Sequence, residues 1–290
     1  MTSYRCSVAA AGQPMTGTAA HDRAFLLIEH PGPWGRKALA ESRWLPEDVR
    51  TTLAERADEA GVRVQLIRRP GATTRGDDFR VVLADTAPGS RWLATTVLTD
   101  PADLLAIDLG NLDAGPPEGF TPEEAPLFLV CTNGRRDVCC AERGRPIAAA
   151  LAAAYPAETW ETTHLGGHRF AGAMLTLPAG LSYGRVEPGS AVEIARATSS
   201  GQLVPAYLRG RTAYDGAVQA AEVELLDRLG LTAIDALTLQ SVEADGPVTT
   251  VTFRHQGGET SVRVTAIDEP PMRQSCADEV EKPSTAWRVD

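Results

Sequence analysis

Short apolar runs, separated by polar and turn-forming residues, recur along the whole chain of 290 residues. Runs of this kind are typical of strands that are buried in a sheet. They predict strands at 25–29, 62–66, 79–84, 92–98 and 126–130. Runs at 173–177 and 182–186 flank Pro178-Ala-Gly180 and predict a hairpin. Near the C-terminus a small antiparallel meander is predicted from the runs at 237–242, 248–255 and 261–266.

Between these runs, apolar residues recur at helical spacing. From 46 to 60, Val49, Leu53 and Ala57 lie on one face of a predicted helix that Gly61 ends. Further helices are predicted after Asp100-Pro101, at 145–154, around 191–195 and within 214–230. Strands that alternate with helices in this way indicate an α/β fold.

A segment rich in Pro and Gly, residues 115–122, is the clearest linker in the chain. We therefore expect an N-terminal α/β domain, a second α/β domain and a C-terminal helix with an antiparallel extension, over 1–118, 119–213 and 214–290. Residues 1–22 are assigned no regular structure. The tail from Asp268 is polar and contains Pro, and Trp287 is expected to pack it along the surface.

Composition excludes several functions. The net charge is -10 and there is no long basic run, which argues against nucleic-acid binding. The sequence lacks both a signal peptide pattern and a run of about eighteen apolar residues, so a cytoplasmic protein without a membrane span is expected. The five cysteines are odd in number and scattered outside one central group. This pattern favours reduced thiols over a disulfide framework.

The central group combines cysteine with histidine. Three of the five cysteines and two of the five histidines fall within 38 residues. Eight residues separate Cys131 from Cys140, and three separate His164 from His168. Cys131 directly follows the predicted strand at 126–130. Two spaced pairs of this kind are a metal-ligand pattern.

The residues around these pairs support the interpretation. Cys139 and Cys140 precede the predicted Ala-rich helix, whose first turn would contain Pro146, so the helix dipole favours thiolates there. Gly166 and Gly167 remove two side chains between the imidazoles and allow the backbone to approach a bound ion.

The segments Cys131-Thr-Asn-Gly-Arg-Arg-Asp-Val-Cys139-Cys140 and His164-Leu-Gly-Gly-His168 resemble the sucrase/ferredoxin-like family. Two further stretches, 177–186 and 29–35, add to the resemblance. It implies a thioredoxin-like ferredoxin domain that binds a [2Fe-2S] cluster. One iron would be held by Cys131 and Cys140, and the other by His164 and His168. The predicted order of strands and helices in residues 1–118 also resembles a thioredoxin-like half that has lost its ligands.

The resemblance implies an electron carrier that transfers one electron through the cluster, and it leaves open whether a proton accompanies the electron. The sequence contains neither a Rossmann fingerprint nor a P-loop, so electrons are expected to come from a separate reductase or another redox protein. Arginines near the pairs would either keep the loops soluble or favour an acidic partner.

Three alternatives remain at this point. The ligand set also suits zinc in a binding or structural module, although zinc cysteines are usually two to four residues apart. Cys139 is adjacent to Cys140 and is an alternative ligand. Ser182 lies in Gly-Leu-Ser-Tyr-Gly, which matches a hydrolase nucleophile motif, but strand-like residues follow it where that motif requires a helix.

Overall fold

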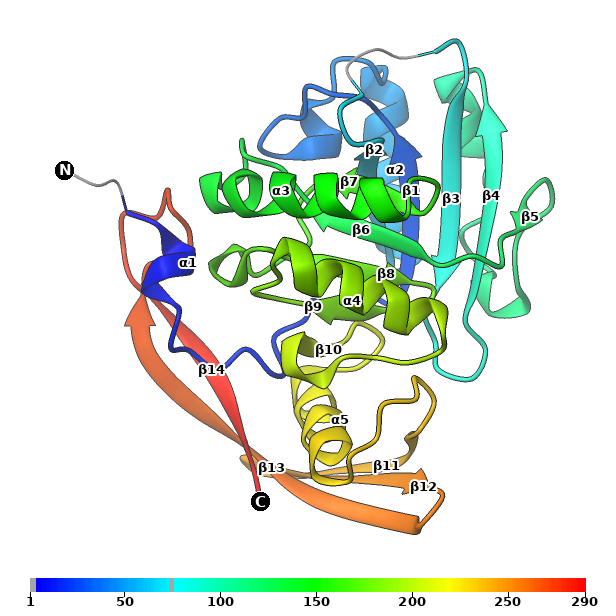
Figure 1. Ribbon diagram of the computed structural model, residues 1–290. Coiled ribbons are helices and arrows are strands. Elements are labelled where there is room, and N and C mark those ends of the chain that lie inside the picture. Colours follow the sequence, from blue (N-terminus) through cyan, green and yellow to red (C-terminus); the bar gives the residue numbers. More distant parts are fainter. Residues whose placement is uncertain (1–3, 73–75) are drawn as a thin grey trace.

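The computed structural model describes residues 4–72 and 76–290. Within these residues the strands form two sheets, one of ten strands and one of four. In Figure 1 the large mixed sheet lies above the smaller antiparallel sheet. The chain therefore has a mixed α/β fold, as its sequence predicts. None of the helices in the described residues has the length and apolar character needed to cross a membrane.

The first half of the large sheet has a simple strand order. Its elements are β1 (Ala24–Glu29), α2 (Glu47–Glu59), β2 (Val62–Arg68), β3 (Phe79–Asp85) and β4 (Trp92–Leu98). β1 pairs in parallel with β2 and antiparallel with β3, and β3 pairs antiparallel with β4. The resulting order is β2-β1-β3-β4, and α2 is the crossover between the two parallel strands.

Short elements complete this half. They are η1 (Ala38–Glu41), η2 (Pro101–Ala106), η3 (Leu112–Ala114) and the edge strand β5 (Thr121–Pro122), which pairs with β4. Asp100 caps η2, because its side chain accepts a hydrogen bond from the backbone N–H of Ala102 at 2.9 Å. α2 buries Val49, Leu53 and Ala57, the face that the sequence predicts.

The second half repeats the strand order of the first. Its elements are β6 (Leu127–Cys131), α3 (Val138–Ala154), β7 (Thr159–Thr162), η4 (His168–Phe170), β8 (Met174–Leu177), β9 (Leu181–Tyr183), α4 (Pro188–Ser199), η5 (Pro205–Tyr207) and β10 (Leu208–Arg211). The order β7-β6-β8-β9 and the strand directions match β2-β1-β3-β4. β10 adds an outer strand beside β9. α3 and α4 lie side by side over one face (Figure 1).

The two halves form one continuous sheet, because β2 pairs antiparallel with β7. Arg68 of β2 lies opposite Glu161 of β7, and its Nε donates to the carboxylate Oε2 at 2.5 Å. Both halves contribute to a shared apolar cluster, which includes Phe25, Leu27, Ile67, Leu129 and Trp160. The seam between β2 and β7 is therefore held by backbone pairing, a partly buried ion pair and apolar contact.

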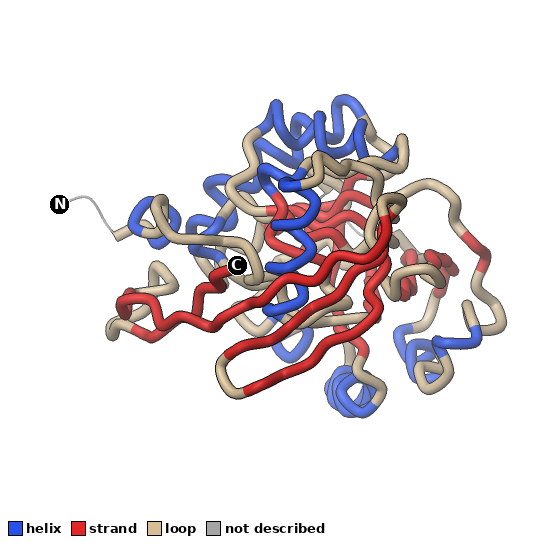
Figure 2. The backbone as a smooth tube through the Cα atoms, turned by 90° about the horizontal axis from the view of Figure 1, so that it is seen from below, coloured by secondary structure: helices blue, strands red, loops and turns tan. Residues whose placement is uncertain are grey.

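The C-terminal region packs against the outer end of the large sheet. It contains α5 (Gly216–Arg228), β11 (Thr238–Asp245), β12 (Val248–His255), β13 (Gly258–Met272) and β14 (Lys282–Val289). The four strands form a single sheet that packs against α5, and in Figure 2, seen from below, they cross in front of the helix. A buried ion pair joins β10 to α5, with Arg211 Nη2 and Glu222 Oε1 2.9 Å apart.

The structure extends one sequence-based prediction and corrects two others. The tail from Asp268 joins the antiparallel sheet, because β13 extends to Met272 and β14 pairs with it as a fourth strand. Within residues 1–22, a short helix α1 (Cys6–Ala9) forms. The helix predicted at 145–154 begins earlier, at Val138, because the Asp137 side chain caps it, so Pro146 lies inside the helix.

Candidate metal centre

Strand β6 and helix α3 bring two sulfur atoms to one point. Cys131 is the last residue of β6, and Cys140 lies in the first turn of α3. Asp137 fixes the start of the helix by accepting a hydrogen bond from the Cys139 N–H at 2.9 Å. Cys131 and Cys140 are each 1% exposed and belong to the same apolar cluster, whereas the adjacent Cys139 belongs to another. The side chains of the two neighbouring cysteines therefore lie in different clusters.

The histidines lie on the loop that follows β7. The sulfur atoms of Cys131 and Cys140 and a ring nitrogen of His164 all lie within 4.8 Å of one another. The ring of His168 stacks on that of His164, with their centroids 4.6 Å apart. The structure thus brings three of the four expected ligands into one group and places the fourth beside it.

The conformation of this loop depends on its glycines and on strand β2. Gly166 and Gly167 have φ values of 89° and 67°, which favour glycine over other residues. Arg63 Nη2 and Gln65 Nε2, both on β2, donate hydrogen bonds to the His164 carbonyl oxygen at 2.7 and 3.1 Å. The first half of the sheet therefore positions a histidine of the second half.

Charge interactions favour a thiolate in the group. The Cys140 thiol and then His164 hold the pKa of Cys131 well below its usual range, although burial opposes this shift. The same interaction with Cys131, followed by burial, raises the pKa of Cys140. Burial and the neighbouring His164 lower the pKa of His168 to about 4, so its imidazole is neutral at pH 7. Thiolate and neutral imidazole are the forms that bind metals.

The Nδ1 atoms of His164 and His168 are buried, and within residues 4–72 and 76–290 neither has a hydrogen-bond partner. Buried polar atoms are normally hydrogen-bonded, so an unpaired ring nitrogen in each of two stacked imidazoles calls for another partner. Two sulfur and two nitrogen ligands suit zinc or an iron-sulfur cluster. The residues present therefore fit a metal centre of this class.

A buried guanidinium lies behind the histidine loop. Arg209 of β10 is 1% exposed and donates to the Gly166 carbonyl at 3.1 Å and to the Thr18 hydroxyl at 3.1 Å. Its other acceptors, the Thr18 carbonyl and the Ser182 hydroxyl, are also neutral oxygens. Burial lowers the pKa of Arg209 to about 9, and the Cys131 thiolate opposes this shift. The side chain therefore places a positive charge near the centre.

Ser182, the residue of the hydrolase-like motif, lies within β9 and not at a turn between a strand and a helix. It is 4% exposed, and its hydroxyl lies 3.5 Å from Arg209 Nη1. In this position Ser182 lacks the exposed strand-to-helix turn that a hydrolase nucleophile requires, and its hydroxyl contacts Arg209 instead.

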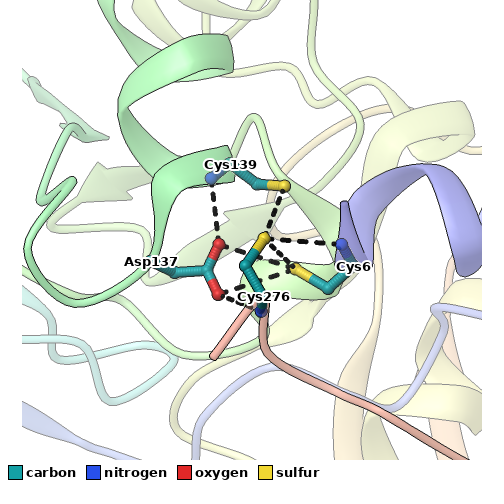
Figure 3. Close-up of side chains that lie close together, drawn as sticks. All are labelled: Cys6, Asp137, Cys139 and Cys276. Carbon is teal, nitrogen blue, oxygen red and sulfur yellow. Dashed lines mark hydrogen bonds between the residues drawn. The ribbon is translucent and has the colours of Figure 1, made fainter. Parts of the chain in front are cut away.

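A second group of cysteines was not predicted from the sequence. Cys6, Cys139 and Cys276 meet beside Asp137, from segments that lie more than a hundred residues apart in the chain (Figure 3). No short spacing connects them, so the pattern of the sequence contains no pair to detect. The only local signal is Asp137-Val-Cys139, next to the better-recognised Cys140.

Comparison with known proteins supports the resemblance in the sequence. The family model described as Suc_Fer-like, sucrase/ferredoxin-like, matches residues 15–210. The chain belongs to the sucrase/ferredoxin-like family. The match covers most of the large sheet and includes all four expected ligands. Searches among curated proteins and among solved structures gave no match.

Proposed function

We propose that this member of the sucrase/ferredoxin-like family is a one-electron carrier with a [2Fe-2S] cluster. Cys131 and Cys140 would hold one iron, and His164 and His168 the other. The observation that carries the proposal is the group of two buried sulfurs and one partly buried imidazole, with a second imidazole stacked on the first. When bound, the cluster supplies a centre that accepts and returns a single electron.

We further propose that the cluster-binding part, residues 119–213, is a thioredoxin-like ferredoxin domain and that residues 1–118 are its ligand-free relative. Both halves of the sheet show the same order of strands, with a helix between the two parallel strands. In the first half, His30 follows β1 as Cys131 ends β6. It is buried and lies 3.0 Å from the Ser42 hydroxyl, so its ring takes part in hydrogen bonding.

The residues of the chain have distinct parts in this proposal. Cys131 and Cys140 lie on the buried side of the centre, whereas His164 and His168 are only partly buried. An electron would therefore enter and leave on the histidine side. Arg209 adds a fixed positive charge in a poorly solvated position, which favours the reduced, more negative state. Gly166 and Gly167 keep the loop close to the centre.

Electrons would come from a separate reductase or another redox protein. Arg135, Arg143 and Arg145 are exposed on or just before the outer part of α3. Exposed positive side chains on this part of the protein would attract an acidic partner.

The visible absorption spectrum of the purified protein, combined with iron and sulfide analysis, tests the proposed function. A reddish protein that contains about two iron and two sulfide ions per chain supports the proposed function. The reduced protein should also give an electron paramagnetic resonance signal that His164→Ala removes or alters. A colourless protein that contains zinc bound by Cys131 and Cys140 would instead identify a zinc-stabilised module.

A further inference from the structure

Three cysteines meet at the N-terminus of α3 (Figure 3). Cys6 comes from α1, Cys139 from the first turn of α3, and Cys276 from the segment between β13 and β14. The side chain of Asp137 points into the same space. One potential ligand atom from each of the four residues lies within 4.8 Å of the other three.

We propose that Cys6, Asp137, Cys139 and Cys276 bind one zinc ion, at a site distinct from the centre at Cys131. Three sulfurs select zinc over magnesium or calcium, which prefer oxygen. The proposal goes beyond the proposed electron transfer and does not depend on it, because the two sites share no ligand.

The distances suit tetrahedral zinc. Zinc binds sulfur at about 2.3 Å and oxygen at about 2.0 Å, so two sulfurs on one ion lie about 3.8 Å apart and a sulfur and an oxygen about 3.5 Å apart. Cys139 and Cys276 sulfurs are 3.3 Å apart, and those of Cys276 and Cys6 are 3.6 Å apart. The Cys6 sulfur lies 3.6 and 3.7 Å from the two Asp137 carboxylate oxygens. Movements of a few tenths of an ångström would accommodate the ion.

The surrounding donors suit metal-bound thiolates, which accept hydrogen bonds. The Ser7 hydroxyl donates to the Cys139 sulfur at 3.2 Å. The Cys6 backbone N–H donates to the Cys276 sulfur at 3.5 Å. Groups that bond to the ligands in this way hold them in position for a metal.

The Asp137 carboxylate is also oriented toward the group. The Ser275 hydroxyl and the Cys276 N–H each donate to its Oδ2 at 2.8 Å. The Asp137 carboxylate therefore caps α3 through Oδ1 and at the same time lies next to the cysteine sulfurs.

Local packing alone gives this region little support. The helix α1 has only four residues, and helices of this length are unstable by themselves. Among residues 4–72 and 76–290, the apolar cluster around the cysteines contains Ala171 and Tyr4 besides the cysteines themselves. Zinc would supply folding free energy that apolar burial does not, and it would fasten both ends of the chain to α3.

Metal analysis of the full-length protein tests the proposal. Wild type should contain about one zinc per chain in addition to any iron. Cys6→Ser and Cys276→Ser should each lose zinc and keep their iron content and visible spectrum. Ser275→Ala, which removes a hydrogen bond to Asp137 but no ligand, should keep zinc. The proposal is wrong if wild type takes up no zinc after incubation with Zn²⁺, or if both Cys→Ser variants retain it.

A second measurement does not depend on the folding of any variant. Co²⁺ added to zinc-depleted wild type should give a sulfur-to-cobalt charge-transfer band in the near ultraviolet, and Zn²⁺ should abolish that band. The absence of this band would overturn the proposal. So would a mass spectrum in which the protein is two hydrogens lighter because of a Cys139–Cys276 disulfide. Iron and sulfide contents report on the cluster alone, so the zinc proposal and the cluster proposal are tested independently.

Discussion

Gly144 of α3 packs directly against the carbonyl group of Cys131, the last residue of β6. A Cβ atom on Gly144 would overlap the Cys131 carbonyl oxygen and would lie 3.2 Å from the Thr132 methyl group. Only glycine lets the helix that carries Cys140 approach the strand that carries Cys131 this closely.

Gly144→Ala should therefore separate the two sulfurs. We expect it to lower the free energy of unfolding by about 1–3 kcal/mol, as overpacking in a core usually does, and to reduce iron content. Chemical denaturation and iron analysis measure the two effects. Gly189→Ala is the matched control, because a Cβ there meets nothing within 4 Å. Equal iron content in the two variants would contradict the argument.

Adjacent cysteines should give opposite results. Cys140 shares its apolar cluster with Cys131, whereas Cys139 faces Cys276, with the two sulfurs 3.3 Å apart. Cys140→Ser should abolish the visible spectrum of the cluster. Cys139→Ser should leave that spectrum nearly intact and remove zinc. If Cys139→Ser loses the cluster and Cys140→Ser retains it, the ligand has been assigned to the wrong residue.

Replacing a histidine ligand by cysteine should lower the reduction potential. Two thiolates and two neutral imidazoles leave the oxidised cluster without net charge, and each additional thiolate makes the cluster more negative and harder to reduce. For His164→Cys and His168→Cys we expect a fall on the order of 100 mV, measured by voltammetry. An unchanged potential in both variants would mean that neither histidine binds the cluster.

The pH dependence of the wild-type potential decides whether a proton accompanies the electron. One coupled proton gives a fall of about 59 mV per pH unit. A flat profile between pH 6 and 10 would identify a centre that transfers electrons alone, and the histidine-to-cysteine variants serve as controls with a weaker slope.

Arg209 should raise the potential through its charge. Its acceptors are neutral oxygens, so its charge is not cancelled by any of them. Arg209→Gln should lower the reduction potential by an amount on the order of tens of millivolts. This is the size expected when a nearby positive charge is removed from a site of intermediate dielectric constant. Arg209→Lys keeps the charge and should retain most of the wild-type value. Redox titration of cluster-loaded protein measures both, and equal potentials in the two variants would exclude a charge effect.

Features with a local pattern can be predicted from the sequence. The apolar runs locate most strands of the large sheet. The spacing of the cysteines and histidines predicts one site, and the structure groups Cys131, Cys140 and His164 within 4.8 Å of one another. β7 was missed because its buried residues include Thr159, Glu161 and Thr162, so it lacks an apolar run.

Contacts between segments that are far apart in the chain cannot be predicted from local sequence patterns. Cys6 and Cys276 are 270 residues apart, and their sulfurs lie 3.6 Å from each other. β14 becomes a strand only because β13 extends far enough to pair with it. In both cases the partner, and not the local sequence, determines the structure.

Because β2 pairs with β7, residues from both halves of the sheet position the proposed centre. Arg63 and Gln65 of β2 donate to the His164 carbonyl, although neither half alone contains both the donors and the histidine. Excision of the second half at the linker would remove the hydrogen bonds that hold its histidine loop, so we expect that half to bind the proposed cluster poorly by itself. If the proposed function is correct, the first half binds no metal and supports the histidine loop of the second half, although both halves have the same strand order.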